Sequence, residues 1–183
     1  MLKGFPSFRL YITSLIVCIF VIVAIIYFEF IGLKPCPMCL LQQFAVLILS
    51  LISLTALFHH PKTCGIRIYS FLIGLVALLA TLTALTQIWM QMHPERYAGS
   101  CQASVNALFN SLPLLDFFKA LFTGTSDCSR VDWQFLGLSL AGYAAIFFAV
   151  LSAVHFYQFT CYERPDKNRQ PISKNIRKNK HRE

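Results

Sequence analysis

Four long apolar runs constrain the fold of this chain more than any other feature. They cover residues 10–28, 39–58, 68–90 and 135–159. Each run is long enough to cross a hydrocarbon layer of about 30 Å as an α-helix, which rises about 1.5 Å per residue. A spanning segment must satisfy its own backbone hydrogen bonds, and the sequence lacks the alternating strands of a membrane barrel. We therefore predict an all-α fold: an integral membrane four-helix bundle with a long extracytoplasmic loop between helices 3 and 4.

The composition agrees with a membrane protein, because 56% of the 183 residues are hydrophobic and only 13% are charged. The first run is longer than a signal-peptide core and ends in Tyr27-Phe28-Glu29-Phe30, so we expect a retained helix. Residues 1–160 form a single transmembrane domain in this prediction, with loops at 29–38 and 91–134 and a basic tail at 161–183. Apolar residues at helical spacing in the long loop, interrupted by Pro113, predict two short helices on the membrane surface, with a loop packed over the helix ends as the alternative.

The basic residues predict the orientation of the bundle, since Lys and Arg next to membrane helices mark the cytoplasmic side. Twelve of the sixteen fall in the N-terminal segment, the 58–68 loop and the tail, and four fall in the other two loops. We therefore expect both termini in the cytoplasm. The tail suits membrane lipid as a partner and not nucleic acid, because it is short, polar and next to the bilayer.

This orientation sorts the seven cysteines. Cys36, Cys39, Cys101 and Cys128 fall outside, Cys18 lies mid-membrane, and Cys64 and Cys161 fall inside. Four cysteines in an oxidising compartment, two in each outer loop, are what two disulfides require. The other three are expected to be small apolar fillers or incidental thiols.

Cys36 and Cys39 form a Cys-x-x-Cys motif at the start of the second predicted helix. Such a pair suits thiol exchange, because its first thiol often has a lowered pKa. Pro37 fits the first helical turn, where its missing N–H costs nothing. Cys39 would then lie among the free amides of a helix N-terminus, which stabilise a thiolate at the membrane edge, within reach of a lipid-soluble electron acceptor.

Cys101 and Cys128 lie in the long loop, where this pair alone would indicate a structural brace. A second pair on the same side favours exchange, since oxidation passes between pairs. A four-cysteine zinc site has the right count, but the loop pair is not a close knuckle and the compartment is oxidising. Gln87, near the outer end of the third helix, is a candidate to hydrogen-bond a quinone carbonyl, with a helix–helix contact as the alternative.

These motifs resemble the disulfide bond formation protein B (DsbB) family over nearly the whole chain, up to about residue 158. The segments that carry the resemblance are Leu33-Lys34-Pro35-Cys36-Pro37-Met38-Cys39, Ser111-Leu112-Pro113-Leu114, Gly124-Thr125-Ser126-Asp127-Cys128 and Trp133-Gln134-Phe135-Leu136-Gly137-Leu138. The last of these is expected to open the fourth helix. Together with four helices and the placement of the cysteines, they form a more specific pattern than a lone Cys-x-x-Cys.

The resemblance implies a protein-dithiol:quinone oxidoreductase of the bacterial inner membrane that sustains disulfide formation in secreted proteins. Its partner would be a DsbA-like thioredoxin-fold protein, and its cofactor a quinone, either ubiquinone or menaquinone. Cys101 would form the mixed disulfide with the partner. Cys128 would be released and pair transiently with Cys36, and Cys39 would be the thiolate facing the quinone.

One position departs from the family pattern. The family usually has an arginine beside the quinone, four residues after the second cysteine of the motif, where this chain has Gln43. Gln43 is therefore an uncharged candidate for quinone binding.

Two rival functions remain. One is a quinone reductase of the vitamin K epoxide type, whose Cys-x-x-Cys lies near the end of a late helix. The other is a non-catalytic membrane scaffold with two structural disulfides.

Overall fold

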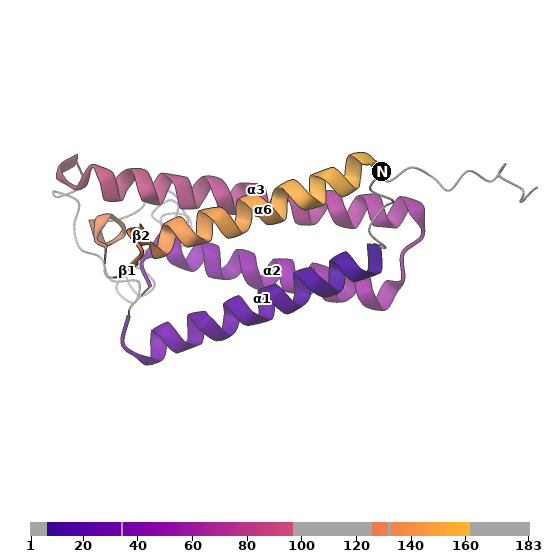
Figure 1. The fold of residues 1–183 in the computed structure, drawn as a ribbon, viewed down its shortest axis with the longest axis horizontal. Coiled ribbons are helices and arrows are strands. Elements are labelled where there is room, and N and C mark those ends of the chain that lie inside the picture. The colour runs from indigo at the N-terminus through magenta and orange to yellow at the C-terminus, as the bar shows by residue number, and fades with distance from the viewer. Residues whose placement is uncertain (1–6, 34, 97–125, 132, 162–183) are drawn as a thin grey trace, which may run out of the picture.

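A computed structural model describes residues 7–33, 35–96, 126–131 and 133–161. Within these residues, four long helices run side by side along the long axis of the molecule (Figure 1). They are α1 (Ser7–Phe30), α2 (Pro37–His59), α3 (Thr63–Met92) and α6 (Leu140–Cys161). Each is long and apolar enough to cross a membrane. The predicted all-α, four-helix membrane fold is confirmed, and the chain is a multi-pass membrane protein.

The outer surface of the bundle is apolar, as contact with lipid requires. Phe20, Leu51 and Phe58 are 73%, 64% and 81% exposed, which a protein in water would avoid for so many large side chains. The inward stripe of α2 has the alternating three- and four-residue spacing of a packed helix. Its members are Met38, Gln42, Val46, Leu49, Ser53 and Ala56. The most extensive helix contact is between α3 and α6, followed by α1 with α2 and α2 with α3.

The connection from α1 to α2 is short because α1 ends in a Schellman motif. The N–H of Gly32 donates to the carbonyl of Glu29 at 3.0 Å, and the N–H of Leu33 donates to the carbonyl of Phe28 at 3.1 Å. Gly32 has a φ of +95°, a left-handed conformation that glycine adopts without the Cβ penalty. This turn brings the end of α1 next to the start of α2 (Figure 1).

The predicted start of the fourth helix at residue 135 is corrected by a small β-hairpin. Strands β1 (Gln134–Phe135) and β2 (Leu138–Ser139) pair antiparallel, and α6 begins only at Leu140. Leu136 and Gly137 form the two-residue turn with φ of +49° and +78°, as a type I′ hairpin turn requires. The apolar run in the sequence hid this turn, because Phe135, Leu136 and Leu138 also suit a helix.

A polar network ties α1 to α3 and α6 at the end opposite the hairpin. Tyr11 Oη donates to the carbonyl of Ile66 at 3.0 Å and lies 3.1 Å from Ser70 Oγ. Ser70 Oγ donates to Gln158 Oε1 at 3.0 Å, and Ser14 Oγ lies 2.9 Å from His155 Nε2. All these side chains are buried. We call this set the α1–α3–α6 polar network.

The remaining described elements are two short 3-10 helices, η1 (Pro94–Arg96) and η2 (Ser126–Ser129). Helix α3 begins earlier than the predicted residue 68, because a helix can continue beyond the apolar run that marks the membrane. The surface helices predicted within residues 97–125, Lys34, and the tail from residue 162 lie outside the described residues.

Candidate active site

The Cys-x-x-Cys motif forms the first turn of α2, as the sequence predicted. Cys36 is the N-cap residue in an extended conformation, and Pro37 occupies the first helical position. The backbone N–H of Cys39 donates to Cys36 Sγ at 3.4 Å, so a sulfur atom takes the place of the usual capping oxygen. The geometry of the helix end therefore holds the two cysteines on the same side of the first turn.

Three cysteines from two distant parts of the chain meet at this turn. The S–H of Cys36 donates to Cys39 Sγ at 3.1 Å. Cys128, which lies on η2, hydrogen-bonds with Cys36 and is fully buried. Met38 and Met90 pack against the same sulfurs. We call Cys36, Cys39 and Cys128 the thiol cluster.

The environment of Cys36 keeps it protonated. Its pKa is raised above the ordinary value, first by the hydrogen bond with Cys128, then by that with Cys39 and by burial. This differs from the expectation that the first thiol of the motif has a lowered pKa, because neighbouring thiols and apolar burial surround it here. Cys36 therefore serves as a donor to Cys39, and Cys39 as the acceptor.

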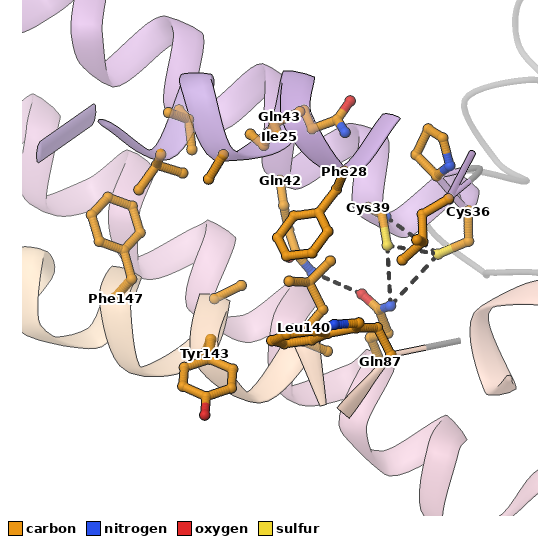
Figure 2. Close-up of a pocket in the computed structure, with 18 of the residues that line it drawn as sticks. Ile25, Phe28, Cys36, Cys39, Gln42, Gln43, Gln87, Leu140, Tyr143 and Phe147 are labelled. Carbon is orange, nitrogen blue, oxygen red and sulfur yellow. Dashed lines mark hydrogen bonds between the residues drawn. The ribbon is translucent and has the colours of Figure 1, made fainter. Parts of the chain in front are cut away.

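Two buried glutamines complete the surroundings of the sulfurs (Figure 2). Gln87 Nε2, from α3, donates to Cys39 Sγ at 3.2 Å and to Cys36 Sγ at 3.6 Å. Gln42 Nε2, from α2, donates to Gln87 Oε1 at 2.9 Å. Gln87 thus faces the thiols directly, and it also forms the helix–helix contact that the sequence left as the alternative.

A largely apolar cavity of about 430 Å³ borders Cys36 and Cys39. Its walls come from α1, α2, α3 and α6, and they include Ile25 and Phe28 of α1 and Phe147 of α6 (Figure 2). Trp133 adds an aromatic surface, with its ring centroid 5.2 Å from that of Phe28. The sequence suggested no such wall, because Trp133 and Phe28 are far apart along the chain.

The polar rim of the cavity includes Gln43 and a charged residue. Gln43 lines the cavity, but its Nε2 donates to Glu29 Oε1 at 3.1 Å, and in Figure 2 its side chain points away from the thiols. Arg130 also lines the cavity and brings the positive charge that Gln43 lacks. Its position two residues after Cys128 was the only signal of this in the sequence.

The other cysteines lie elsewhere. Cys18 is fully buried in the core between the helices, and Cys64 and Cys161 are exposed at the opposite end of the bundle. Cys101, predicted to receive the partner's electrons, lies outside the described residues.

The membrane-spanning bundle and its thiol cluster define a class of protein, the membrane oxidoreductases that act on thiols and disulfides. The sequence matches the family described as "Disulfide bond formation protein DsbB" over residues 7–158. The chain belongs to this family, as its motifs indicated, and its role is therefore in disulfide bond formation.

Individual relatives agree with this assignment. "Disulfide bond formation protein B" of Methylococcus capsulatus is 37% identical, over 87% of this chain and 98% of that protein. The protein of the same name from Saccharophagus degradans is 35% identical, over 84% of this chain and 93% of that protein. The one from Aromatoleum aromaticum is 41% identical over 63% of this chain and 69% of that protein. No solved structure shows significant similarity to the chain.

Proposed function

We propose that this protein reoxidises a DsbA-like thioredoxin-fold dithiol oxidase and passes the electrons to a membrane quinone. The observation that carries the proposal is the thiol cluster, which joins a cysteine of the long loop to a Cys-x-x-Cys pair at the edge of an apolar cavity. Exchange requires sulfur atoms in contact with one another, and transfer to a lipid-soluble acceptor requires one of them to border an apolar space.

The exchange steps balance in two stages. The partner's dithiol reduces a Cys101–Cys128 disulfide to two thiols, and the partner leaves with its own disulfide. The loop dithiol then reduces a Cys36–Cys39 disulfide in the same way. The hydrogen bond between Cys128 and Cys36 supports this route, whereas the roles of Cys101 and the order of transfer rest on the family resemblance.

The cavity fits a quinone in size and in chemistry. A volume of about 430 Å³ lies in the range of small-molecule sites, which are mostly apolar with a few placed polar groups. Phe28 and Trp133 would pack against the bound molecule, while Arg130 would offer hydrogen-bond donors. Gln43 and Gln87 also line the cavity and remain candidates. A bound quinone would accept two electrons from the Cys36–Cys39 dithiol together with two protons.

Within the chain, Cys39 is the sulfur best prepared for this transfer. Its Sγ accepts hydrogen bonds from the Cys36 thiol and from Gln87, and hydrogen bonds to sulfur favour the thiolate. Cys36 holds the proton, and the surrounding apolar residues keep water from the reacting atoms. We place this end of the bundle in the periplasm, with both termini in the cytoplasm and the helices in the bacterial inner membrane.

The test is quinone reduction by the purified full-length chain with a reduced thioredoxin-fold donor of the DsbA type. We expect one quinone to be reduced for each donor dithiol that is oxidised. The loss of quinone absorbance measures the reduction. Cys39→Ser should abolish quinone reduction, whereas Cys64→Ser, at the far end of the bundle, should leave the rate unchanged. Cys128→Ser should trap a mixed disulfide between the donor and Cys101. If the donor stays reduced with the unaltered chain, the disulfides are structural and the proposal is wrong.

A further inference from the structure

The strongest feature that the proposed route leaves unused is Gln42. Its side chain is 8% exposed and that of Gln87 is 4% exposed, although both belong to membrane-spanning helices. Burying an amide is unfavourable unless its hydrogen bonds are made, so a pair of such residues beside the thiols calls for a reason beyond packing. The amides form a directed chain from Gln42 to Gln87 to the sulfurs (Figure 2).

The direction of this chain depends on Gln42. A glutamine amide has an accepting oxygen and a donating nitrogen, and its two orientations occupy nearly the same space. Gln42 donates to Gln87 Oε1 at 2.9 Å, and this bond turns the oxygen of Gln87 toward Gln42 and away from the sulfurs (Figure 2). The N–H groups of Gln87 then face Cys36 and Cys39.

The two orientations of Gln87 have opposite effects on the sulfurs. N–H groups that point at a sulfur stabilise the thiolate, whereas a carbonyl oxygen in that place accepts an S–H and stabilises the thiol. We propose that Gln42 is a positioning residue that holds Gln87 with its donors toward the Cys36–Cys39 pair and so keeps Cys39 as the reactive thiolate. Gln87 touches the reacting atoms, and Gln42 acts only through it.

This inference deepens the proposed function, because the thiolate is the form that reacts in thiol exchange. Its test uses neither donor nor quinone, so its failure is distinguishable from failure of the proposed route. The reduced full-length chain is alkylated in short pulses of iodoacetamide across a pH series, and the modified fraction of Cys39 is measured by peptide mass spectrometry.

Gln42→Met keeps a similar volume but removes the amide. We expect the midpoint of Cys39 alkylation to move to higher pH by about one unit, as loss of a hydrogen bond to a charged group implies. Gln87→Met should give at least as large a shift. The control is Thr86→Val, because Thr86 is exposed and, among the described residues, its hydroxyl bonds to the carbonyl of Leu82 in its own helix.

The double variant decides whether Gln42 acts through Gln87. In the Gln87→Met background, Gln42→Met should give no further shift, because residues that share one network are not additive. An equal shift in both backgrounds, or none with Gln87 intact, would overturn the inference. If Gln42→Met fails to fold, Gln42→Leu provides the same comparison.

Discussion

The three sulfurs of the thiol cluster are chemically unequal because of their neighbours. Cys36 donates to Cys39 and hydrogen-bonds with Cys128, and it is 8% exposed. Its raised pKa leaves little thiolate at neutral pH, so it reacts with outside reagents slowly. Cys39, which accepts two hydrogen bonds, is the better nucleophile of the pair.

A single substitution should make Cys36 more reactive. Cys128→Ala removes the hydrogen bond that is the largest cause of the raised pKa of Cys36. The pKa then falls, the thiolate fraction at a given pH rises, and the alkylation profile of Cys36 moves to lower pH. Peptide mass spectrometry of the reduced protein measures this shift. Met90→Leu is the packing control, since Met90 belongs to the same buried cluster without that hydrogen bond; an equal shift there would assign the effect to packing.

The sequence predicted the residues of the site better than their roles. Cys36, Pro37 and Cys39 adopt the predicted helix N-terminus, because capping depends on local residues. Gln42 lies one helical turn after Cys39, so periodicity alone places it on that face, but its bond to Gln87 needs the packing of α2 on α3. Arg130 reaches the cavity through the tertiary fold, which no local pattern describes.

At the scale of elements, the hydrophobicity of the sequence predicted that four helices exist. The positions of the helix ends depend on turns, which hydrophobicity does not reveal. The four apolar runs became four helices, because a segment in lipid must satisfy its own backbone hydrogen bonds. The start of α6 was hidden by the β1–β2 hairpin, which is held by Ser139 Oγ donating to Gln91 Oε1 at 2.7 Å and by Tyr143 Oη donating to the carbonyl of Phe135 at 3.0 Å. The first bond joins residues far apart in the sequence and the second depends on the hairpin turn, so the pattern of apolar residues could not reveal either of them.

The α1–α3–α6 polar network should stabilise the packing of α1. Ser14→Ala removes the contact with His155 Nε2, and side-chain hydrogen bonds between membrane helices contribute about 0.6 kcal/mol, up to about 1.7 kcal/mol. We expect a loss of that size in the free energy of unfolding, measured by denaturant titration in detergent. Thr13→Ala is the matched control, since within the part of the chain that the structure describes the Thr13 hydroxyl bonds to the carbonyl of Arg9 in its own helix. Equal losses in both variants would show that the network adds no stability.

At the scale of the whole molecule, the bundle has two chemically different ends. The β1–β2 hairpin and the first turn of α2, which carries Cys36 and Cys39, lie at one end (Figure 1). The start of α1, near Arg9, and the α2–α3 connection, with Lys62 and Cys64, lie at the other. From the positive-inside rule we expect the second end to face the cytoplasm.

Labelling of sealed cells tests this orientation. In a chain carrying Glu95→Cys, a membrane-impermeant maleimide should modify the new cysteine on η1, which is exposed at the thiol-cluster end. It should not modify Cys64, which is also exposed but lies at the other end, until the cells are lysed. Labelling of Cys64 before lysis would reverse the proposed orientation.

The length of α2 keeps the thiol cluster far from Cys64 and Cys161, at the other end of the bundle. Its 23 residues extend over about 35 Å, with Cys39 in its first turn and Cys64 just beyond its last. Thiol–disulfide exchange requires one sulfur atom to attack another at contact distance. The length of the helices therefore prevents exchange between the thiols at the two ends. In the proposed orientation, the cluster at one end can be oxidised while Cys64 and Cys161 stay in contact with a reducing compartment, and electrons do not pass directly between the two sets of thiols.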